Sequence, residues 1–195
     1  MTCKVAILVS GTGTNMEALI DAMNDPDFGA EPVLVLSDTP DAVALRKAHR
    51  KNVPTSVVDH RNYRHDRRSF DRKINEALVE ANADVVCLAG FMRILGEEFV
   101  RNWENRVLNI HPSLLPDYRG LDTHRRAIID GREQAGCTVH LVTVELDAGP
   151  IVGQTAVPIL PGDTPDSLAA RVAKVEHRLY PTVLKNFIRA LQRNP

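Results

Sequence analysis

The chain has 195 residues, which is long enough to bury a core without disulfides or a structural metal ion, and we expect residues 1–195 to form one domain. The formal net charge is −1, and the 24 lysines and arginines are spread along the sequence, which argues against a nucleic-acid-binding protein. Cys3, Cys87 and Cys137 show no zinc-ligand spacing, and Cys87 and Cys137 lie in apolar runs, so reduced core thiols are expected. The apolar run at 5–9 is too short for a signal sequence or a membrane span, so a cytoplasmic protein is expected.

The first half of the sequence alternates short apolar runs with stretches of helical periodicity. Strands are predicted at 4–9, 33–36, 53–58 and 84–89. Between them, apolar residues recur at helical spacing, as Met16, Leu19, Ile20 and Met23 do after the first strand. This alternation predicts right-handed βαβ crossovers, and therefore an α/β fold with a Rossmann-like, mostly parallel sheet and helices on both faces.

The second half changes character. A strand at 107–110 is followed by a proline-rich turn at 112–120 and by a helix that begins near Thr123. Two β-branched runs, 137–146 and 151–157, are separated only by residues 147–150, which predicts a C-terminal antiparallel strand pair. A long final helix is expected from about residue 164, and Pro181 should kink or divide it.

A glycine turn, Ser10–Asn15, lies between the first strand and the first helix. It departs from the dinucleotide fingerprint because Met16 occupies the third glycine position, and Asp38 is the only candidate for a ribose-binding acid. Backbone N–H groups at a helix N-terminus and nearby hydroxyls suit a phosphate monoester better. The alternative is a plain turn with Asn15 near the helix cap.

Asn109 and His111 lie two residues apart at the end of the strand that Pro112 stops. They should point from one strand face into the crevice beyond the carboxyl ends of the strands, where α/β proteins bind ligands. The alternative is that His111 only caps the strand and Asn109 satisfies loop backbone groups.

Five motifs in register resemble the phosphoribosylglycinamide formyltransferase family over nearly the whole chain. They are Ser10–Asn15, Ala89–Leu95, Asn109–Pro116, Glu145–Pro150 and Glu176–Pro181. The resemblance implies transfer of a formyl group from 10-formyltetrahydrofolate to the amine of glycinamide ribonucleotide, in purine biosynthesis, without a metal ion. The chain departs from the family pattern at Ala148, where Gly is common, and in the segment with Arg119 and Asp122.

The resemblance also assigns residues to roles. It implies a catalytic set of Asn109, His111 and Asp147. The ribonucleotide would be held by Gly11, Thr12, Gly13, Thr14, Asn15 and Glu176. The folate would be surrounded by Arg67, Met92, Arg93, Ile94, Leu95, Asn109, Thr143, Val144, Glu145, Leu146 and Asp147. From spacing alone, Arg67 is a solvated charge and Glu176 a surface ion-pair partner of His177, while His140 faces either the site or the core.

Attack of an amine on a formyl carbon creates an oxyanion, which Asn109 and a protonated His111 could stabilise. Because an ordinary histidine is mostly neutral at pH 7, Asp147 is expected to favour the imidazolium. The proton could leave through His111, Asp147 or an ordered water.

Other functions stay open at this point. Methionyl-tRNA formyltransferase and formyltetrahydrofolate deformylase share the Asn-x-His-Pro core, and a non-catalytic folate- or nucleotide-binding module is a further alternative. A dehydrogenase is the weakest alternative. The expected partners are small molecules, with no nucleic acid or membrane, and the chain is expected to be a monomer or a homodimer.

Overall fold

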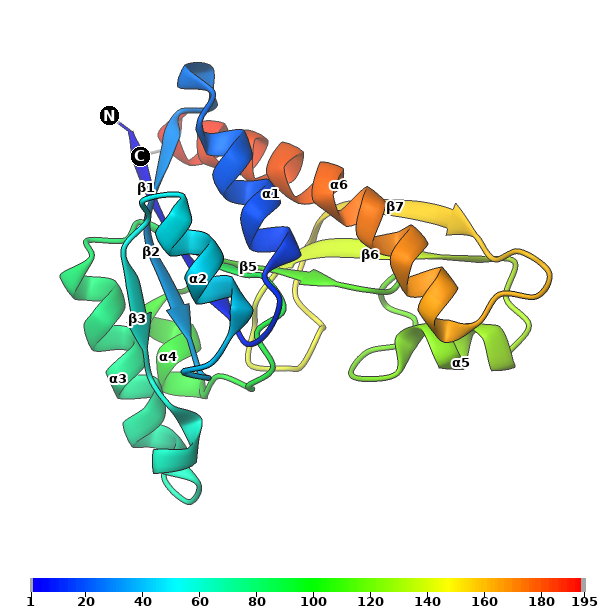
Figure 1. Ribbon diagram of the computed structural model, residues 1–195, viewed down its shortest axis with the longest axis horizontal. Helices are drawn as coiled ribbons and strands as arrows, with labels where there is room; N and C mark the ends of the chain where they lie inside the picture. The colour runs from blue at the N-terminus through cyan, green and yellow to red at the C-terminus, as the bar shows by residue number, and fades with distance from the viewer. Residues whose placement is uncertain (1, 194–195) are drawn as a thin grey trace.

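The computed structural model describes residues 2–193, which form one seven-stranded sheet with helices around it (Figure 1). The strand order is β3-β2-β1-β4-β5-β6-β7. The strands are β1 (Cys3–Val9), β2 (Ala30–Ser37), β3 (Thr55–Val57), β4 (Val85–Leu88), β5 (Val107–His111), β6 (Gln134–Leu141) and β7 (Ile151–Pro158). Neighbouring strands from β3 to β5 pair in parallel, whereas β6 and β7 are antiparallel, which confirms the predicted fold class.

The helices follow the predicted crossovers. They are α1 (Thr14–Met23), α2 (Val43–Arg50), α3 (Arg67–Glu80), α4 (Glu97–Asn102), α5 (Thr123–Ile129) and α6 (Pro165–Arg193), with short 3-10 turns η1 (Pro26–Phe28) and η2 (His60–Tyr63). In Figure 1, α6 runs beside α1 and along β6 and β7, and α5 lies at the end of the sheet farthest from α3. Neither α4 nor the 3-10 turns were predicted from the sequence.

Two hydrophobic cores lie on the two faces of the sheet because successive side chains of β1 alternate between them. Val5, Ile7 and Val9 pack in one core with buried residues of α1, α2 and α6. Ala6 and Leu8 pack in the other core with buried residues of α3 and α4. The continuous apolar run at the start of the chain is therefore a central strand that is buried on both sides.

The three cysteines are free and buried, as predicted. Burial raises the pKa of the Cys87 and Cys137 thiols to about 12, which keeps both thiols protonated and unreactive at neutral pH.

The structure corrects two predicted strand boundaries and the expectation that Pro181 divides the last helix. β3 is shorter than the predicted strand at 53–58, and β6 ends at Leu141, so residues 142–150 form a loop instead of strand residues followed by a tight turn. In this loop Val144 and Leu146 are exposed, so their apolar character does not come from a buried sheet position. Pro181 does not divide α6, which is one continuous helix. Pro181 is buried, and the adjacent Tyr180 hydroxyl donates to the Leu108 carbonyl oxygen at 2.9 Å, so tertiary packing holds this part of the helix against the sheet.

Candidate active site

A cavity of about 540 Å³ opens beyond the carboxyl ends of β4 and β5. Its walls come from the ends of these strands, from residues 90–95, 120–125, 142–144 and 146–147, and from the first turns of α6. Ligands of open α/β sheets bind at this edge, so the cavity lies where the sequence placed the crevice.

Asn109 and His111 both line this cavity from β5, which confirms that they share one strand face. His111 is buried and Asn109 half-buried. The Asn109 amide nitrogen lies 3.1 Å from Nε2 of His140, which stands opposite Asn109 on the antiparallel neighbour β6. The alternative in which the two side chains only finish the strand is therefore not supported.

Asp147 reaches the same cavity from the 142–150 loop. Its Oδ2 lies 3.4 Å from His111 Nδ1, and its Oδ1 lies 3.6 Å from His140 Nε2. Oδ2 also accepts a hydrogen bond of 2.9 Å from the Gly120 backbone N–H. The residue has a φ of 49°, a left-handed conformation that is uncommon outside glycine but better tolerated by Asp. Residues far apart in the sequence thus bring a carboxylate beside two imidazoles.

The charge of His111 differs from the expectation. Burial lowers the pKa of His111, and this outweighs the Tyr118 carbonyl and Asp147, which both raise it. Neutral imidazole therefore predominates at pH 7, and the imidazolium predicted from the sequence is wrong for the ligand-free protein. Nε2 carries the proton, because it lies 2.9 Å from the Tyr118 carbonyl oxygen and a carbonyl only accepts. Nδ1 then faces the carboxylate and is placed to take up a proton.

The Asp147 carboxylate stays ionised. Burial alone raises its pKa, but the hydrogen bond from the Gly120 N–H and the neighbouring imidazoles of His140 and His111 hold the pKa below its ordinary value. A proton that arrives on His111 Nδ1 therefore meets a negative charge.

The sequence left open whether His140 faces the site or the core, and the structure places it on the cavity wall. Its side chain is buried, and its Nδ1 lies 2.9 Å from the Leu141 carbonyl, so Nδ1 carries the proton and Nε2 accepts from the Asn109 amide. This contact fixes which end of the Asn109 amide points toward His140. Only the pairing of β5 with β6 could have revealed it.

The glycine turn lies beside the 90–95 segment of the cavity wall. The Ser10 hydroxyl accepts a hydrogen bond of 2.8 Å from the Met92 N–H, and Ser10 N–H donates to the Gly90 carbonyl. Gly13 has a φ of 71° at the N-cap of α1, and an added Cβ would lie 2.6 Å from the Ala44 Cβ. The turn therefore needs glycine at this position for its backbone course.

Glu176 is not the surface ion-pair partner that its spacing suggested. It is buried, and its Oε2 accepts a hydrogen bond of 2.8 Å from the Asn15 amide of α1. Burial raises the pKa of Glu176, partly offset by this hydrogen bond. The Asn15 Oδ1 is buried without a hydrogen-bond partner among the described residues. The two residues from α1 and α6 that the family resemblance assigned to the ribonucleotide are thus in direct contact.

Both segments assigned to the folate reach the cavity. Their lining residues are Met92, Arg93, Ile94, Leu95, Thr143, Val144, Leu146 and Asp147. Met92, Ile94 and Val144 are 59%, 57% and 58% exposed, an unusual number of open apolar side chains on one wall. They form an apolar surface suited to a flat ring.

Two residues of the folate set lie outside the cavity wall. Arg67 donates to the Leu95 carbonyl at 3.0 Å and lines a separate hollow between α3 and α4. Glu145 pairs with Arg119 at 2.6 Å. The structure therefore places both next to lining residues but not among them.

Asp38 has a different partner from the one a dinucleotide would offer. It is fully buried, and its Oδ2 accepts a hydrogen bond of 2.9 Å from Nε of Arg93. This leaves the dehydrogenase alternative without its ribose-binding acid.

Within residues 2–193, no group of His, Cys, Asp and Glu side chains is arranged to hold a metal ion. In the same part of the chain, none of the helices combines the length and apolar character that crossing a bilayer requires.

The parallel sheet with two antiparallel strands and the Asn–His–Asp cluster at its edge defines the class of protein. Residues 3–184 match the family model described as formyl transferase, and the chain belongs to this family of enzymes.

More particular similarities follow. The chain is 42% identical to the phosphoribosylglycinamide formyltransferase of Escherichia coli K12 over 94% of this chain and 86% of the relative. The crystal structure of the enzyme of the same name from Brucella melitensis has a TM-score of 0.91 and 49% identity, and covers 96% of both chains. The trifunctional purine biosynthetic protein adenosine-3 of Gallus gallus is 48% identical over 93% of this chain, but the chain spans only 18% of that protein.

Proposed function

We propose that the chain transfers the formyl group of 10-formyltetrahydrofolate to the amine of N1-(5-phosphoribosyl)glycinamide, giving the N-formyl product and tetrahydrofolate in de novo purine biosynthesis. The observation that most supports this is the meeting of Asn109, His111 and Asp147 in one cavity. The similarity to phosphoribosylglycinamide formyltransferase favours this acceptor over others.

The two substrates are proposed to bind at adjacent parts of the same edge. The folate, a cosubstrate, lies against residues 92–95 and 143–147, with Arg67 next to this wall through its contact with the Leu95 carbonyl. The phosphate binds at Gly11–Asn15, where backbone N–H groups meet the N-terminus of α1. Glu176, held by Asn15, accepts from the glycinamide part.

The proposed reaction begins with attack of the substrate amine on the formyl carbon. The new C–N bond forms as the carbonyl electron pair moves to oxygen, and the Asn109 amide donates to this oxyanion. His111 Nδ1 takes the proton that the amine loses, and Asp147 stabilises the imidazolium. When the bond to the folate nitrogen breaks, a proton returns to that nitrogen and the formyl carbonyl re-forms.

The purified full chain tests the proposal with 10-formyltetrahydrofolate and three competing acceptors: glycinamide ribonucleotide, initiator methionyl-tRNA and water. We expect formylated glycinamide ribonucleotide as the main product, and a His111→Ala variant measures the background. Formyl-methionyl-tRNA or free formate as the main product would refute the assignment. Folate binding without turnover, seen by difference spectra, would instead support a non-catalytic module.

We further propose that the substrates are the only partners required, that residues 1–195 act as one domain, and that the monomer or homodimer works in the cytoplasm. We expect full activity of the purified chain without added protein. A requirement for a second protein fraction would contradict it.

A further inference from the structure

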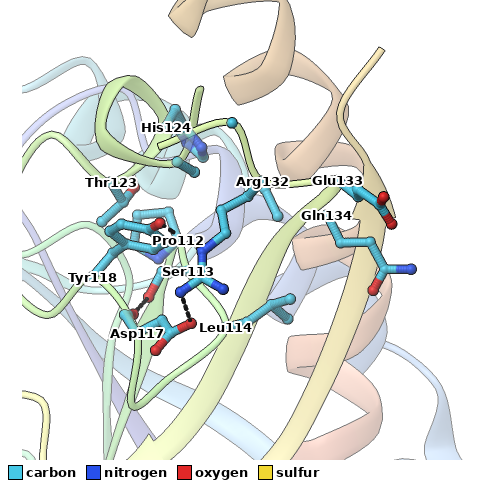
Figure 2. Close-up of a pocket in the computed structure, with 13 residues that line it drawn as sticks. Pro112, Ser113, Leu114, Asp117, Tyr118, Thr123, His124, Arg132, Glu133 and Gln134 are labelled. Atoms are coloured by element: carbon cyan, nitrogen blue, oxygen red, sulfur yellow. Dashed lines mark hydrogen bonds and ion pairs between the residues drawn. The ribbon is translucent and has the colours of Figure 1, made fainter. Parts of the chain in front are cut away.

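A second cavity, of about 450 Å³, lies next to the active-site cavity and shares Pro112, Thr123 and His124 with it (Figure 2). Residues 112–118 form one wall, and α5 with residues 131–135 forms the others. Because the two cavities share these residues, the second cavity borders the chain segment that follows His111.

Tyr118 occupies a backbone conformation that needs support from its neighbours. Its φ is 57°, in the left-handed region where a bulky side chain is uncommon. Its hydroxyl donates to Asp130 at 2.8 Å and accepts from Arg132 Nε at 3.0 Å. The guanidinium carbons of Arg126 and Arg132 lie 5.2 and 5.7 Å from the ring centroid, within the range of cation–π attraction.

Arg132 holds two consecutive residues of this segment at once. While Nε contacts the Tyr118 hydroxyl, Nη2 donates to Asp117 Oδ2 at 2.9 Å (Figure 2). The planar guanidinium suits such a double contact, which the ammonium of a lysine cannot reproduce. Half of the Arg132 side chain is exposed, so it is not part of either hydrophobic core.

The segment that Arg132 holds contacts the reaction centre through one backbone atom. The Tyr118 carbonyl oxygen lies 2.9 Å from His111 Nε2, and this contact keeps the proton on Nε2 and turns Nδ1 toward Asp147. We propose that Arg132 is a positioning residue for the formyl transfer: by clamping Asp117 and Tyr118, it fixes the carbonyl that sets the tautomer and orientation of His111. The proposal rests on the proposed function for its kinetic consequence, but its structural consequence can be measured without turnover.

Titratable and charged groups from several elements face His111. They are Asp147 from the 142–150 loop, His140 from β6, and Arg126 and His124 from α5. Arg126 acts on His111 directly and lowers its pKa, so an Arg126 variant would mix two effects. Arg132 contacts the Tyr118 ring and hydroxyl, so its removal reports on the Tyr118 carbonyl. Since that carbonyl raises the pKa of His111, loss of the contact lowers this pKa.

The experiment compares Arg132→Ala with Glu133→Gln. Glu133 is an exposed neighbour that lines the same cavity, and it lies away from the contacts that Arg132 makes with Asp117 and Tyr118 (Figure 2). Imidazole ¹⁵N NMR on histidine-labelled full-length protein follows the tautomer and pKa of His111, assigned with His111→Ala. In Arg132→Ala we expect a mixture of tautomers, a lower His111 pKa and kcat reduced by about tenfold with little change in KM. Glu133→Gln should match the wild type in all three.

Tyr118→Phe provides a second variant, because it keeps the ring but removes the hydroxyl that Arg132 and Asp130 contact. We expect a smaller change in the same direction, and Arg132→Lys should recover only part of the loss. An unchanged His111 tautomer and pKa in Arg132→Ala would overturn the inference, as would equal losses of kcat in Arg132→Ala and Glu133→Gln. If the proposed function fails, no variant turns over glycinamide ribonucleotide, yet the NMR titration still decides whether Arg132 positions His111.

Discussion

Replacement of Asp147 by asparagine tests whether turnover needs a carboxylate beside His111. The substitution keeps the size of the side chain but removes a charge whose Oδ2 lies 3.4 Å from His111 Nδ1. At this separation and an effective dielectric constant of about 20, the attraction between Asp147 and an imidazolium is roughly 5 kcal/mol. The amide dipole and solvent recover part of this, so we expect kcat to fall by about 10²–10³, or about 3–4 kcal/mol.

The pH profile supplies an independent readout of Asp147. Asp147 raises the pKa of His111, so its neutralisation lowers that pKa further below the ordinary value of 6.5. A base works in its neutral form, so the acid limb of kcat/KM should move to lower pH in Asp147→Asn.

Steady-state formyl transfer to glycinamide ribonucleotide, followed by the absorbance change of the folate between pH 5 and pH 9, measures both effects. Glu104→Gln is the control, since it also converts a carboxylate to an amide, but Glu104 is exposed and lies outside the cavity. A folded Asp147→Asn enzyme with kcat within about threefold of wild type and an unmoved acid limb would refute the role of Asp147.

Four further outcomes are expected. His111→Ala should lower kcat by about 100-fold or more with an unchanged melting temperature, and near-normal turnover would remove His111 from the mechanism. His140→Phe, which removes the acceptor of the Asn109 amide, should cost about tenfold in kcat, and His140→Gln should recover part of it; equal activities would contradict this. Gly13→Ala should destabilise the fold by about 2–3 kcal/mol in urea unfolding, because a Cβ meets Ala44 and φ is positive; an unchanged midpoint would contradict the steric argument. Dialysis against EDTA should leave turnover unchanged, and a loss restored by a divalent metal would refute metal-free catalysis.

The sequence best predicted the features that depend on a single strand or helix. Val107–His111 reads as a strand, and the period of two along it places Asn109 and His111 on the same face, as the structure confirms. The parallel part of the sheet follows from the same local logic, because a strand, a glycine turn and an amphipathic helix repeat along the first half.

The features of the site that the sequence did not predict depend mainly on contacts between distant segments. His140 meets Asn109 only through the register of β5 and β6, and Glu176 meets Asn15 only because α6 packs against α1. Val144 was predicted as part of a strand because an apolar side chain that lines a ligand cavity resembles one that lines a core. The charge of His111 required knowledge of its burial, which outweighs the nearby carboxylate.

The separation of the two cores from the polar cluster has a practical consequence. Asn109, His111 and Asp147 belong to neither core, so a side chain that performs chemistry can be replaced by an isostere without disturbing the packing that holds the chain together. The Asp147→Asn protein should therefore retain an intact pocket while turning over slowly. In such a slow variant, a complex with both substrates bound can be studied before the formyl group is transferred.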